Sequence, residues 1–202
     1  MHTLNEVKTY GGVGSLLLLL AFVPTVGFIL AIAGAILVLV AVKYASDIFG
    51  DPKIFNNMLF AIILGVVALV IGVVAVVAVV FQAIGLGYLS SSFVAVHPTA
   101  NMGAGNFIGI VSAVLLGLAA VWVCLLLSSI FVRRSYSELG KRLNVGMFGT
   151  AALLYLIGAA LAIVIVGFVL IFIAEILLVV AFFSINTQMP MNQPMQPAQP
   201  TT

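Results

Sequence analysis

One acidic residue, Glu175, lies inside a long apolar segment and is the best candidate in this chain for a functional side chain. It is the only charged residue after Arg142. A charge at the centre of a membrane costs roughly 3 kcal/mol on insertion scales, so such a residue marks a functional site by default. We therefore take Glu175 as a candidate intramembrane functional carboxylate, facing the bundle interior because lipid offers no hydrogen-bond partner. The alternative is a protonated carboxyl group that only hydrogen-bonds to a neighbouring helix.

Four basic residues gather in a shorter segment before it, namely Arg133, Arg134, Lys141 and Arg142. We predict that they contact anionic lipid headgroups, which attract each Lys or Arg near the membrane surface by about 1 kcal/mol. Glu138, four residues before Arg142, offsets part of this charge. The alternative is that the cluster only fixes the orientation of the chain. Nucleic-acid binding is not expected, because it needs more positive charge and exposed aromatic side chains.

A polar segment in the first third of the chain holds most of the remaining oxygen-bearing side chains. Asp47, Asp51, Asn56 and Asn57 could gather around a cation. Their spacing, however, is not the alternating pattern of a cation-binding loop. We predict instead that they cap helices and that Lys43 and Asp47, four residues apart, form an ion pair.

No catalytic motif and no set of metal ligands is found in the sequence. His97 has no Cys or carboxylate neighbour at ligand spacing. Cys124 is the single cysteine and is expected to pack against other helices or lipid. We therefore predict no catalytic, cofactor-binding or metal-binding residues, and a protein that is not an enzyme.

The composition shows what kind of protein must position these residues. Of 202 residues, 64% are hydrophobic and 6% are charged, whereas soluble domains carry about 25% charged residues. Residues 9–42 and 54–132 contain no Asp, Glu, Lys or Arg, and a helix needs roughly 20 apolar residues to cross a membrane. A soluble domain and a disordered chain are excluded. The predicted fold class is an all-α integral membrane bundle.

Helix start and stop signals divide the chain into about six transmembrane helices. Thr3 and Glu6 form a capping-box pattern, Pro24 predicts a break, and Gly50 suits a helix end. A further break is expected at Val164–Gly167, although glycine alone is a weak helix breaker in lipid. The predicted helices cover residues 3–22, 25–47, 52–86 and 106–142, followed by two helices within 145–186.

A short internal repeat relates two parts of this bundle. Residues 27–41 and 167–181 agree at seven of fifteen aligned positions. If the match reflects a duplication, helices one and two correspond to helices five and six, and both hairpins enter the membrane from the same side as a parallel pseudo-repeat. The alternative is chance similarity between apolar segments. Glu175 aligns with Ala35, so its role is not duplicated.

The basic residues predict the orientation of the chain. With six spans, all seven Lys and Arg lie on one face, which the positive-inside rule assigns to the cytoplasm. We therefore predict a multi-pass protein of the cell membrane with cytoplasmic N- and C-termini and an outer loop over 87–105. A four-span arrangement would place Lys8 on the opposite face and requires spans that are too long.

The C-terminal segment differs in composition from the rest. We divide the chain into a transmembrane domain, 1–188, and a disordered Pro-, Gln- and Met-rich cytoplasmic tail, 189–202. Three prolines of this tail recur every third residue, a period that could serve a docking motif for a cytoplasmic protein partner. Glycines four residues apart, such as Gly105 and Gly109, allow close helix contacts and could support a homo-oligomer.

Several segments together resemble a known family. They are Tyr10–Gly14, Pro24–Gly27, the polar stretch Lys43–Asn57, and the closing Leu153–Ala159 and Ile176–Ile185. Over roughly residues 8–186 the chain resembles the archaeal multi-pass membrane proteins grouped as domain of unknown function 996. The resemblance implies an archaeal membrane location and no established activity, and it supplies no catalytic residues.

We expect a non-enzymatic multi-pass membrane protein with a structural or partner-organising role. The alternative is a small transporter or channel that uses Glu175 in its path. The lipid bilayer is the one partner that the composition requires, because only lipid can solvate such a surface.

Overall fold

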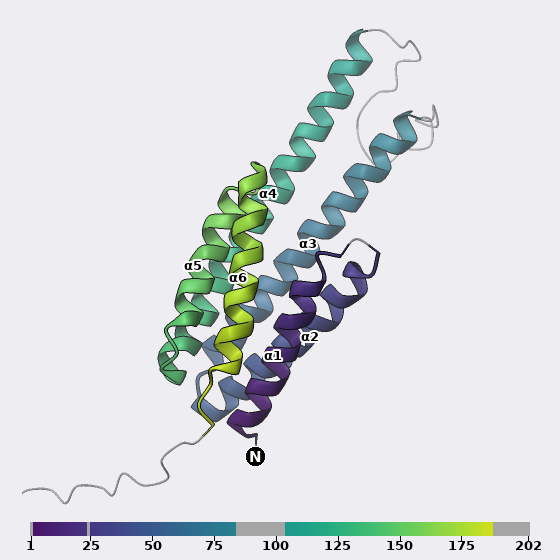
Figure 1. Cartoon of the computed structure of the whole chain (residues 1–202). Helices are drawn as coiled ribbons and strands as arrows, with labels where there is room; N and C mark the ends of the chain where they lie inside the picture. Colours follow the sequence, from purple (N-terminus) through teal and green to yellow (C-terminus); the bar gives the residue numbers. More distant parts are fainter. Residues whose placement is uncertain (1, 24, 84–103, 188–202) are drawn as a thin grey trace, which may run out of the picture.

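The computed structural model describes residues 2–23, 25–83 and 104–187, and within these ranges the chain is helical without strands. The predicted all-α bundle is confirmed. The tail 189–202 and most of the predicted loop lie outside the described residues. Six helices follow one another (Figure 1): α1 Leu4–Leu20, α2 Gly27–Phe49, α3 Pro52–Ala83, α4 Ala104–Leu143, α5 Met147–Ala160 and α6 Ile165–Phe183.

The six helices form three antiparallel hairpins that close into a ring. Each helix packs against the next one in sequence, and α6 returns to pack against α1. The short connections at residues 50–51 and 144–146 force neighbouring helices to run in opposite directions. The ring therefore has an interior to which every helix contributes one face.

The helix ends follow the local signals in the sequence. The main-chain N–H of Thr3 donates to Glu6 Oε2 at 2.9 Å, and the N–H of Glu6 donates to Thr3 Oγ1 at 3.4 Å, so the capping box is confirmed. Gly50 ends α2 with φ of +64°, the left-handed conformation that favours glycine. Asp51 Oδ1 accepts from the N–H of Lys53 at 3.1 Å and caps α3, as expected.

The turn between α1 and α2 and the turn between α5 and α6, which form the tips of two hairpins, have the same construction. A Cβ atom on Gly27 would overlap the carbonyl group of Ala21, and one on Gly167 would overlap the carbonyl group of Leu161. Each glycine thus lets the chain fold back against a residue six positions earlier. This correspondence agrees with the predicted repeat of helices one–two and five–six.

The break between the last two helices lies slightly earlier than expected. It was predicted at residues 164–167, but α5 ends at Ala160 and α6 begins at Ile165. Main-chain hydrogen bonds from Leu161 to Ile157 and from Val164 to Leu161 form the turn itself. Gly167 therefore lies inside the first turn of α6, where it permits close packing.

The hydrophobic core lies at the end of the bundle where α4 joins α5. The rings of Phe148 and Phe182 meet edge to face with 4.8 Å between centroids, and the Tyr136 ring lies 5.9 Å from Phe148. Gly11 of α1 leaves the space that the Phe182 ring occupies. Around these rings lie fully buried aliphatic side chains, including Val7, Val42, Ala45, Ile54, Leu139 and Leu178.

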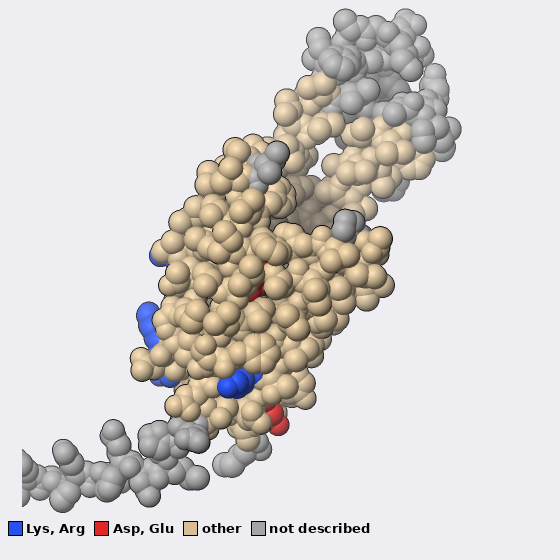
Figure 2. All heavy atoms as spheres, viewed as in Figure 1, with Lys and Arg blue, Asp and Glu red and all other residues tan. Residues whose placement is uncertain are grey.

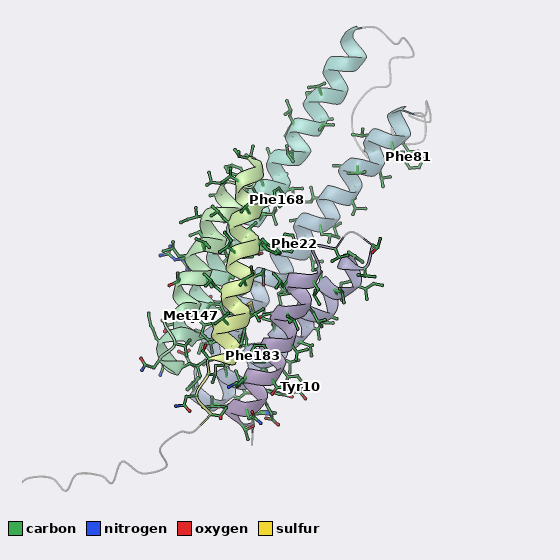
Figure 3. All side chains as sticks on the ribbon, viewed as in Figure 1. Tyr10, Phe22, Phe81, Met147, Phe168 and Phe183 are labelled. Atoms are coloured by element: carbon green, nitrogen blue, oxygen red, sulfur yellow. The ribbon has the colours of Figure 1, made fainter. Side chains whose placement is uncertain are left out.

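Two helices are much longer than the others. At 1.5 Å per residue, the 32 residues of α3 extend about 48 Å and the 40 residues of α4 about 60 Å. The indole Nε1 of Trp122 donates to the carbonyl oxygen of Ala160 at 3.3 Å, so α5 ends level with Trp122. The parts of α3 and α4 beyond this level, which we call the arm, project from the ring (Figure 1). Figure 3 shows Phe22 and Phe168 near the hairpin tips and Phe81 on the arm.

The helices differ in their capacity to cross a membrane. Among the described residues, α2, α3, α4 and α6 are long and apolar enough to do so. The 17 residues of α1 and the 14 residues of α5 extend only about 26 and 21 Å, less than a ~30 Å hydrocarbon core. The chain is thus a membrane-associated helical protein, and a full crossing by α1 and α5 stays a prediction.

Basic residues occupy one end of the molecule. The start of α1, the end of α2, the start of α3 and the last turns of α4 carry all of the Lys and Arg, and these helix ends meet opposite the arm. Figure 2 shows Lys and Arg atoms along the left edge from about mid-height downward and at the lower centre, while the upper part of this face has none. We call this end the charged end.

Candidate functional site

The interior of the ring contains a cavity of about 310 Å³ to which all six helices contribute. This volume lies at the lower limit of small-molecule sites, which are about 300–1,000 Å³. Most of the lining side chains are aliphatic. The polar exceptions are Ser128 and Tyr136 of α4, Tyr155 of α5 and Glu175 of α6.

Glu175 faces this cavity, as the sequence predicted. The residue is only 7% exposed, and its Oε2 atom is buried without a hydrogen-bond partner. Ser128 does not supply that partner, because its hydroxyl donates to the carbonyl oxygen of Ala61 at 2.8 Å. Glu175 therefore keeps unused hydrogen-bonding capacity in the cavity.

The two ends of the cavity differ. Toward the charged end, the lining residues Val38, Tyr136 and Leu178 are at most 3% exposed and belong to the packed core. Away from that end, Phe28 of α2 and Val66 and Leu69 of α3 are about half exposed or more. The cavity is thus closed toward the charged end and has an apolar rim at the level of the hairpin tips.

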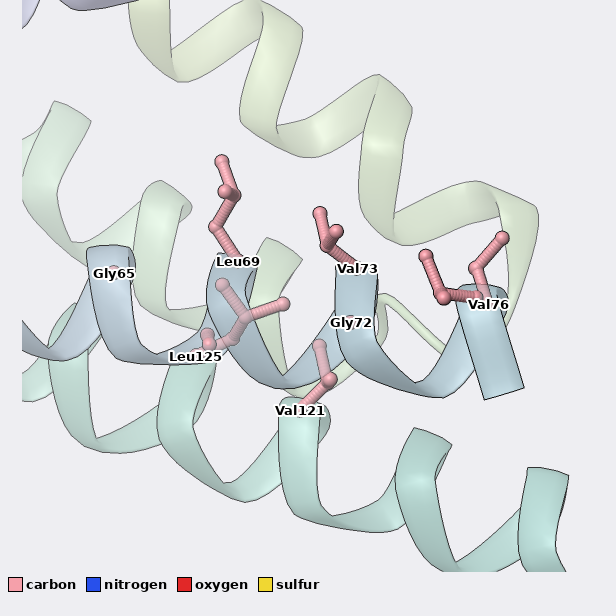
Figure 4. A pocket seen from close by; sticks show the side chains of 9 residues that line it. Gly65, Leu69, Gly72, Val73, Val76, Val121 and Leu125 are labelled. Carbon is pink, nitrogen blue, oxygen red and sulfur yellow. The ribbon is translucent and has the colours of Figure 1, made fainter. Parts of the chain in front are cut away.

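A second cavity, of about 550 Å³, lies against α3 and α4 beyond this rim (Figure 4). Leu69 and Val73 of α3 and Val121 and Leu125 of α4 line it, and every other lining residue is glycine or aliphatic. It shares Gly65 and Leu69 with the cavity around Glu175, which we call the central cavity. An apolar surface of this kind can accommodate hydrocarbon but carries no reactive group.

A third cavity, of about 460 Å³, lies near the charged end between α3, α4 and α5. Three of the four predicted headgroup contacts, Arg133, Arg134 and Lys141, line it together with Lys53. The fourth, Arg142, is not among them, because its Nη2 donates to Asp51 Oδ2 at 3.1 Å. The predicted group of four is therefore brought together only in part.

Sequence reasoning missed the α3 side of this basic cavity. Lys53 and Asn57 are four residues apart and so lie on one face of the first turns of α3. That spacing was available in the sequence. What it could not indicate was that this face lies beside the basic face of α4.

The polar segment near the α2–α3 turn acts as predicted. Lys43 Nζ donates to Asp47 Oδ1 at 2.6 Å, and Asp51 caps α3 while it pairs with Arg142. Within the described ranges, no three His, Cys, Asp or Glu side chains are grouped to hold a metal ion. His97 lies outside those ranges, and Cys124 is half-buried on α4.

A known family matches the region that holds the basic cavity and most of the residues around Glu175. The family described as Protein of unknown function (DUF996) matches residues 30–176. The chain belongs to this family. It is 35% identical over 182 residues to an uncharacterised protein of Methanocaldococcus jannaschii, a match that covers 90% of this chain and 93% of that protein. No solved structure matches the chain. The predicted family resemblance is confirmed.

Proposed function

We propose that this protein is a small, non-enzymatic membrane transporter whose substrate site is the central cavity. The observation that carries the proposal is the buried, unpartnered Oε2 of Glu175 in a cavity built from all six helices. A buried polar atom without a partner costs roughly 1–3 kcal/mol. A ligand that donates a hydrogen bond or brings a positive charge removes this cost.

The lining of the cavity favours an organic cation with an apolar body. The carboxyl group of Glu175 can neutralise a positive charge. Two tyrosines, Tyr136 and Tyr155, line the same space, and aromatic rings bind quaternary ammonium groups through cation–π attraction. The aliphatic remainder of the lining suits alkyl groups. Together these features favour a tetraalkylammonium ion over a small inorganic cation, which would require more oxygen ligands.

The shape of the cavity is consistent with one state of a carrier. Packed core residues close it toward the charged end, and its apolar rim lies level with Trp122, beside the middle of the charge-free stretch of α4. The substrate sites of transporters lie near the bilayer midplane and open to one side of the membrane at a time. Transport therefore requires a second state in which the core around Tyr136 and Leu178 opens.

Binding and uptake of radiolabelled tetrapropylammonium test this proposal. We expect the purified protein to bind the ion and proteoliposomes to take it up. Glu175→Gln keeps the size of the side chain but removes its charge, and the attraction between two unit charges about 5 Å apart is roughly 3 kcal/mol at an effective dielectric constant near 20. The substitution should therefore weaken binding at least tenfold and abolish uptake.

The matched control is Glu138→Gln, which removes one carboxylate at the charged end, where Glu138 pairs with Lys141 at 3.3 Å. This variant should bind tetrapropylammonium like the wild type. If Glu175→Gln and the wild type bind and transport the ion equally, or if neither binds it, the proposal is wrong.

A structural or partner-organising role is the second candidate, and one observation favours it. The arm exposes large apolar side chains on several faces, including Val76, Leu116 and Leu118, which are 63%, 73% and 56% exposed. Such a surface can pack against another copy of the chain or another membrane protein as well as lipid. Cross-linking from Leu116→Cys in membranes, in a Cys124→Ala background, tests this role. A disulfide-linked dimer supports it, and a purely monomeric product contradicts self-association through this face.

A further inference from the structure

We propose that the basic cavity between α3, α4 and α5 binds the phosphate group of an anionic phospholipid whose acyl chains run along the adjoining apolar wall. This inference does not depend on the transporter proposal. It concerns a different cavity, which shares no lining residue with the cavity around Glu175.

The charge of the cavity suits a phosphate. Lys53, Arg133, Arg134 and Lys141 line it against one acidic residue, Glu138, which leaves an excess of three positive charges. Glu138 pairs with Lys141. Among the described residues, the ion pairs of the chain involve none of the other three basic side chains. Those three are therefore available for a ligand, and arginines bind phosphate oxygens in a bidentate manner.

The geometry of the helices gathers these side chains on one face. Arg133, Ser137 and Lys141 follow one another at intervals of four residues on α4, which places them on the same side of the helix. The hydroxyl of Ser135 donates to the carbonyl oxygen of Ile54 at 2.8 Å and so sets the start of α3 level with this stretch. Lys53 therefore enters the cavity from the neighbouring helix.

Other residues indicate a lipid rather than a soluble anion. The cavity also has an apolar wall, formed by Ile130 of α4 and Leu156 of α5, and Ile130 is 38% exposed. The guanidinium group of Arg134 lies 5.6 Å from the centroid of the Phe131 ring, and Phe131 belongs to the charge-free stretch of α4. A phosphate beside hydrocarbon is the chemistry of a phospholipid, whereas a free phosphate gains nothing from an aliphatic wall.

The position along α4 agrees with the depth of lipid phosphates. Residues 111–132 are free of charge and extend about 33 Å, close to the ~30 Å of a hydrocarbon core. Arg133 and Arg134 follow directly, at the boundary where headgroups begin. If the bundle were instead placed with Leu143 at that boundary, Arg133 would lie about 15 Å deep in hydrocarbon, an unfavourable position for an exposed charge.

Lipid binding to the purified protein tests the proposal, with phosphatidylglycerol, phosphatidylcholine of the same acyl chains and inorganic phosphate as probes. Native mass spectrometry after delipidation and titration measures the affinities. We expect phosphatidylglycerol to bind at least tenfold more tightly than phosphatidylcholine, and inorganic phosphate at millimolar concentration not to displace it. Equal binding of the two lipids would overturn the proposal. Displacement by inorganic phosphate would show a free-anion site and would also overturn it.

Two triple variants with the same change in net charge locate the site. The first variant removes the available charges of the cavity by Lys53→Gln, Arg133→Gln and Arg134→Gln. It should lower the affinity for phosphatidylglycerol at least tenfold, since each contact contributes about fivefold. The second variant is the control and removes three charges outside the cavity by Lys8→Gln, Lys43→Gln and Arg142→Gln. It should change the affinity for phosphatidylglycerol less than threefold. Equal losses in both variants would show general attraction to the charged end and overturn the proposal.

A milder variant keeps the test informative if the first triple variant does not fold. Arg133→Lys with Arg134→Lys retains the charge and orientation of the chain but loses the planar fork that binds two phosphate oxygens. We expect severalfold weaker binding of phosphatidylglycerol with an unchanged circular dichroism spectrum. Unchanged binding in this double variant would contradict the assigned roles of the two arginines.

Discussion

The hydroxyl of Ser135 on α4 donates a 2.8 Å hydrogen bond to the main-chain carbonyl oxygen of Ile54 on α3. The same contact recurs seven residues away, where Ser128 donates to the carbonyl oxygen of Ala61, also at 2.8 Å. The equal spacing on two antiparallel helices means that the pair of serines fixes one register of α3 against α4. Both cavities that contain polar residues depend on this register.

Replacing both serines with alanine should destabilise the α3–α4 pair. Interhelical hydrogen bonds in membrane proteins contribute about 0.6 kcal/mol each on average, so Ser128→Ala with Ser135→Ala should lower the free energy of unfolding by about 1 kcal/mol. Unfolding in mixed detergent micelles measures the change. Ser129→Ala is the control, because that hydroxyl bonds within α4, to Leu126 at 2.7 Å. An equal loss in the control would show that the interhelical contacts contribute nothing specific.

Gly34 should not tolerate a side chain. A Cβ atom there would lie 2.7 Å from the carbonyl oxygen of Gly14, where the backbones of α1 and α2 lie against each other. We expect Gly34→Ala to lower the free energy of unfolding by about 1–3 kcal/mol, as overpacking does. In Gly149→Ala the new Cβ meets nothing within 4 Å, so this matched change should be neutral or stabilising by up to about 1 kcal/mol through helix propensity. Thermal unfolding in detergent separates the two outcomes.

Cysteine labelling tests the orientation of the chain. In a Cys124→Ala background, an impermeant maleimide added to intact cells should label Ser91→Cys, and it should label Ser137→Cys only after permeabilisation. The physical reason is the location of all Lys and Arg at the charged end and the cost of moving them across a membrane. Ser129→Cys is the unreactive control, since Ser129 is fully buried. Labelling of both test positions from outside would rule out the predicted topology.

Truncations should show where the packed structure ends. Removal of residues 189–202 should leave the melting temperature in detergent unchanged, because this segment has four prolines and few large aliphatic side chains. Removal from Ile185 onward should lower it by several degrees. Ile185 is 2% exposed, and its carbonyl oxygen accepts a hydrogen bond from Lys8 Nζ at 3.2 Å. A large drop with the shorter truncation would mean that the tail stabilises the bundle.

The sequence was sufficient wherever a structural feature depends on neighbouring residues. The capping box at Thr3, the turn at Gly50 and the Lys43–Asp47 pair all arise within a few positions of the chain, so local chemistry determines them. The interior position of Glu175 was also predictable. It is the single charge in a long apolar segment, so solvation alone requires it to avoid lipid.

The composition of the two polar cavities could not be predicted in the same way. Helical spacing groups Arg142 with Glu138 and Arg134, four and eight residues earlier, yet Arg142 pairs with Asp51, which is 91 positions away. Likewise, nothing local indicates that Tyr136, Tyr155 and Glu175 line one space. These groupings depend on how the six helices are ordered in the ring, and that order is set by packing between distant segments.

The unequal lengths of the helices give the molecule a tapered outline. Six helices lie side by side at the charged end, but only α3 and α4 continue into the arm. With a helix diameter of about 10 Å, the cross-section falls roughly threefold along the molecule. A bilayer centred on the charge-free stretch 111–132 of α4 would hold the ring in the leaflet at the charged end and the arm in the other leaflet, so it would lose more lipid area from the first leaflet. The protein would then act as a wedge and would be most stable where the membrane is convex toward the charged end.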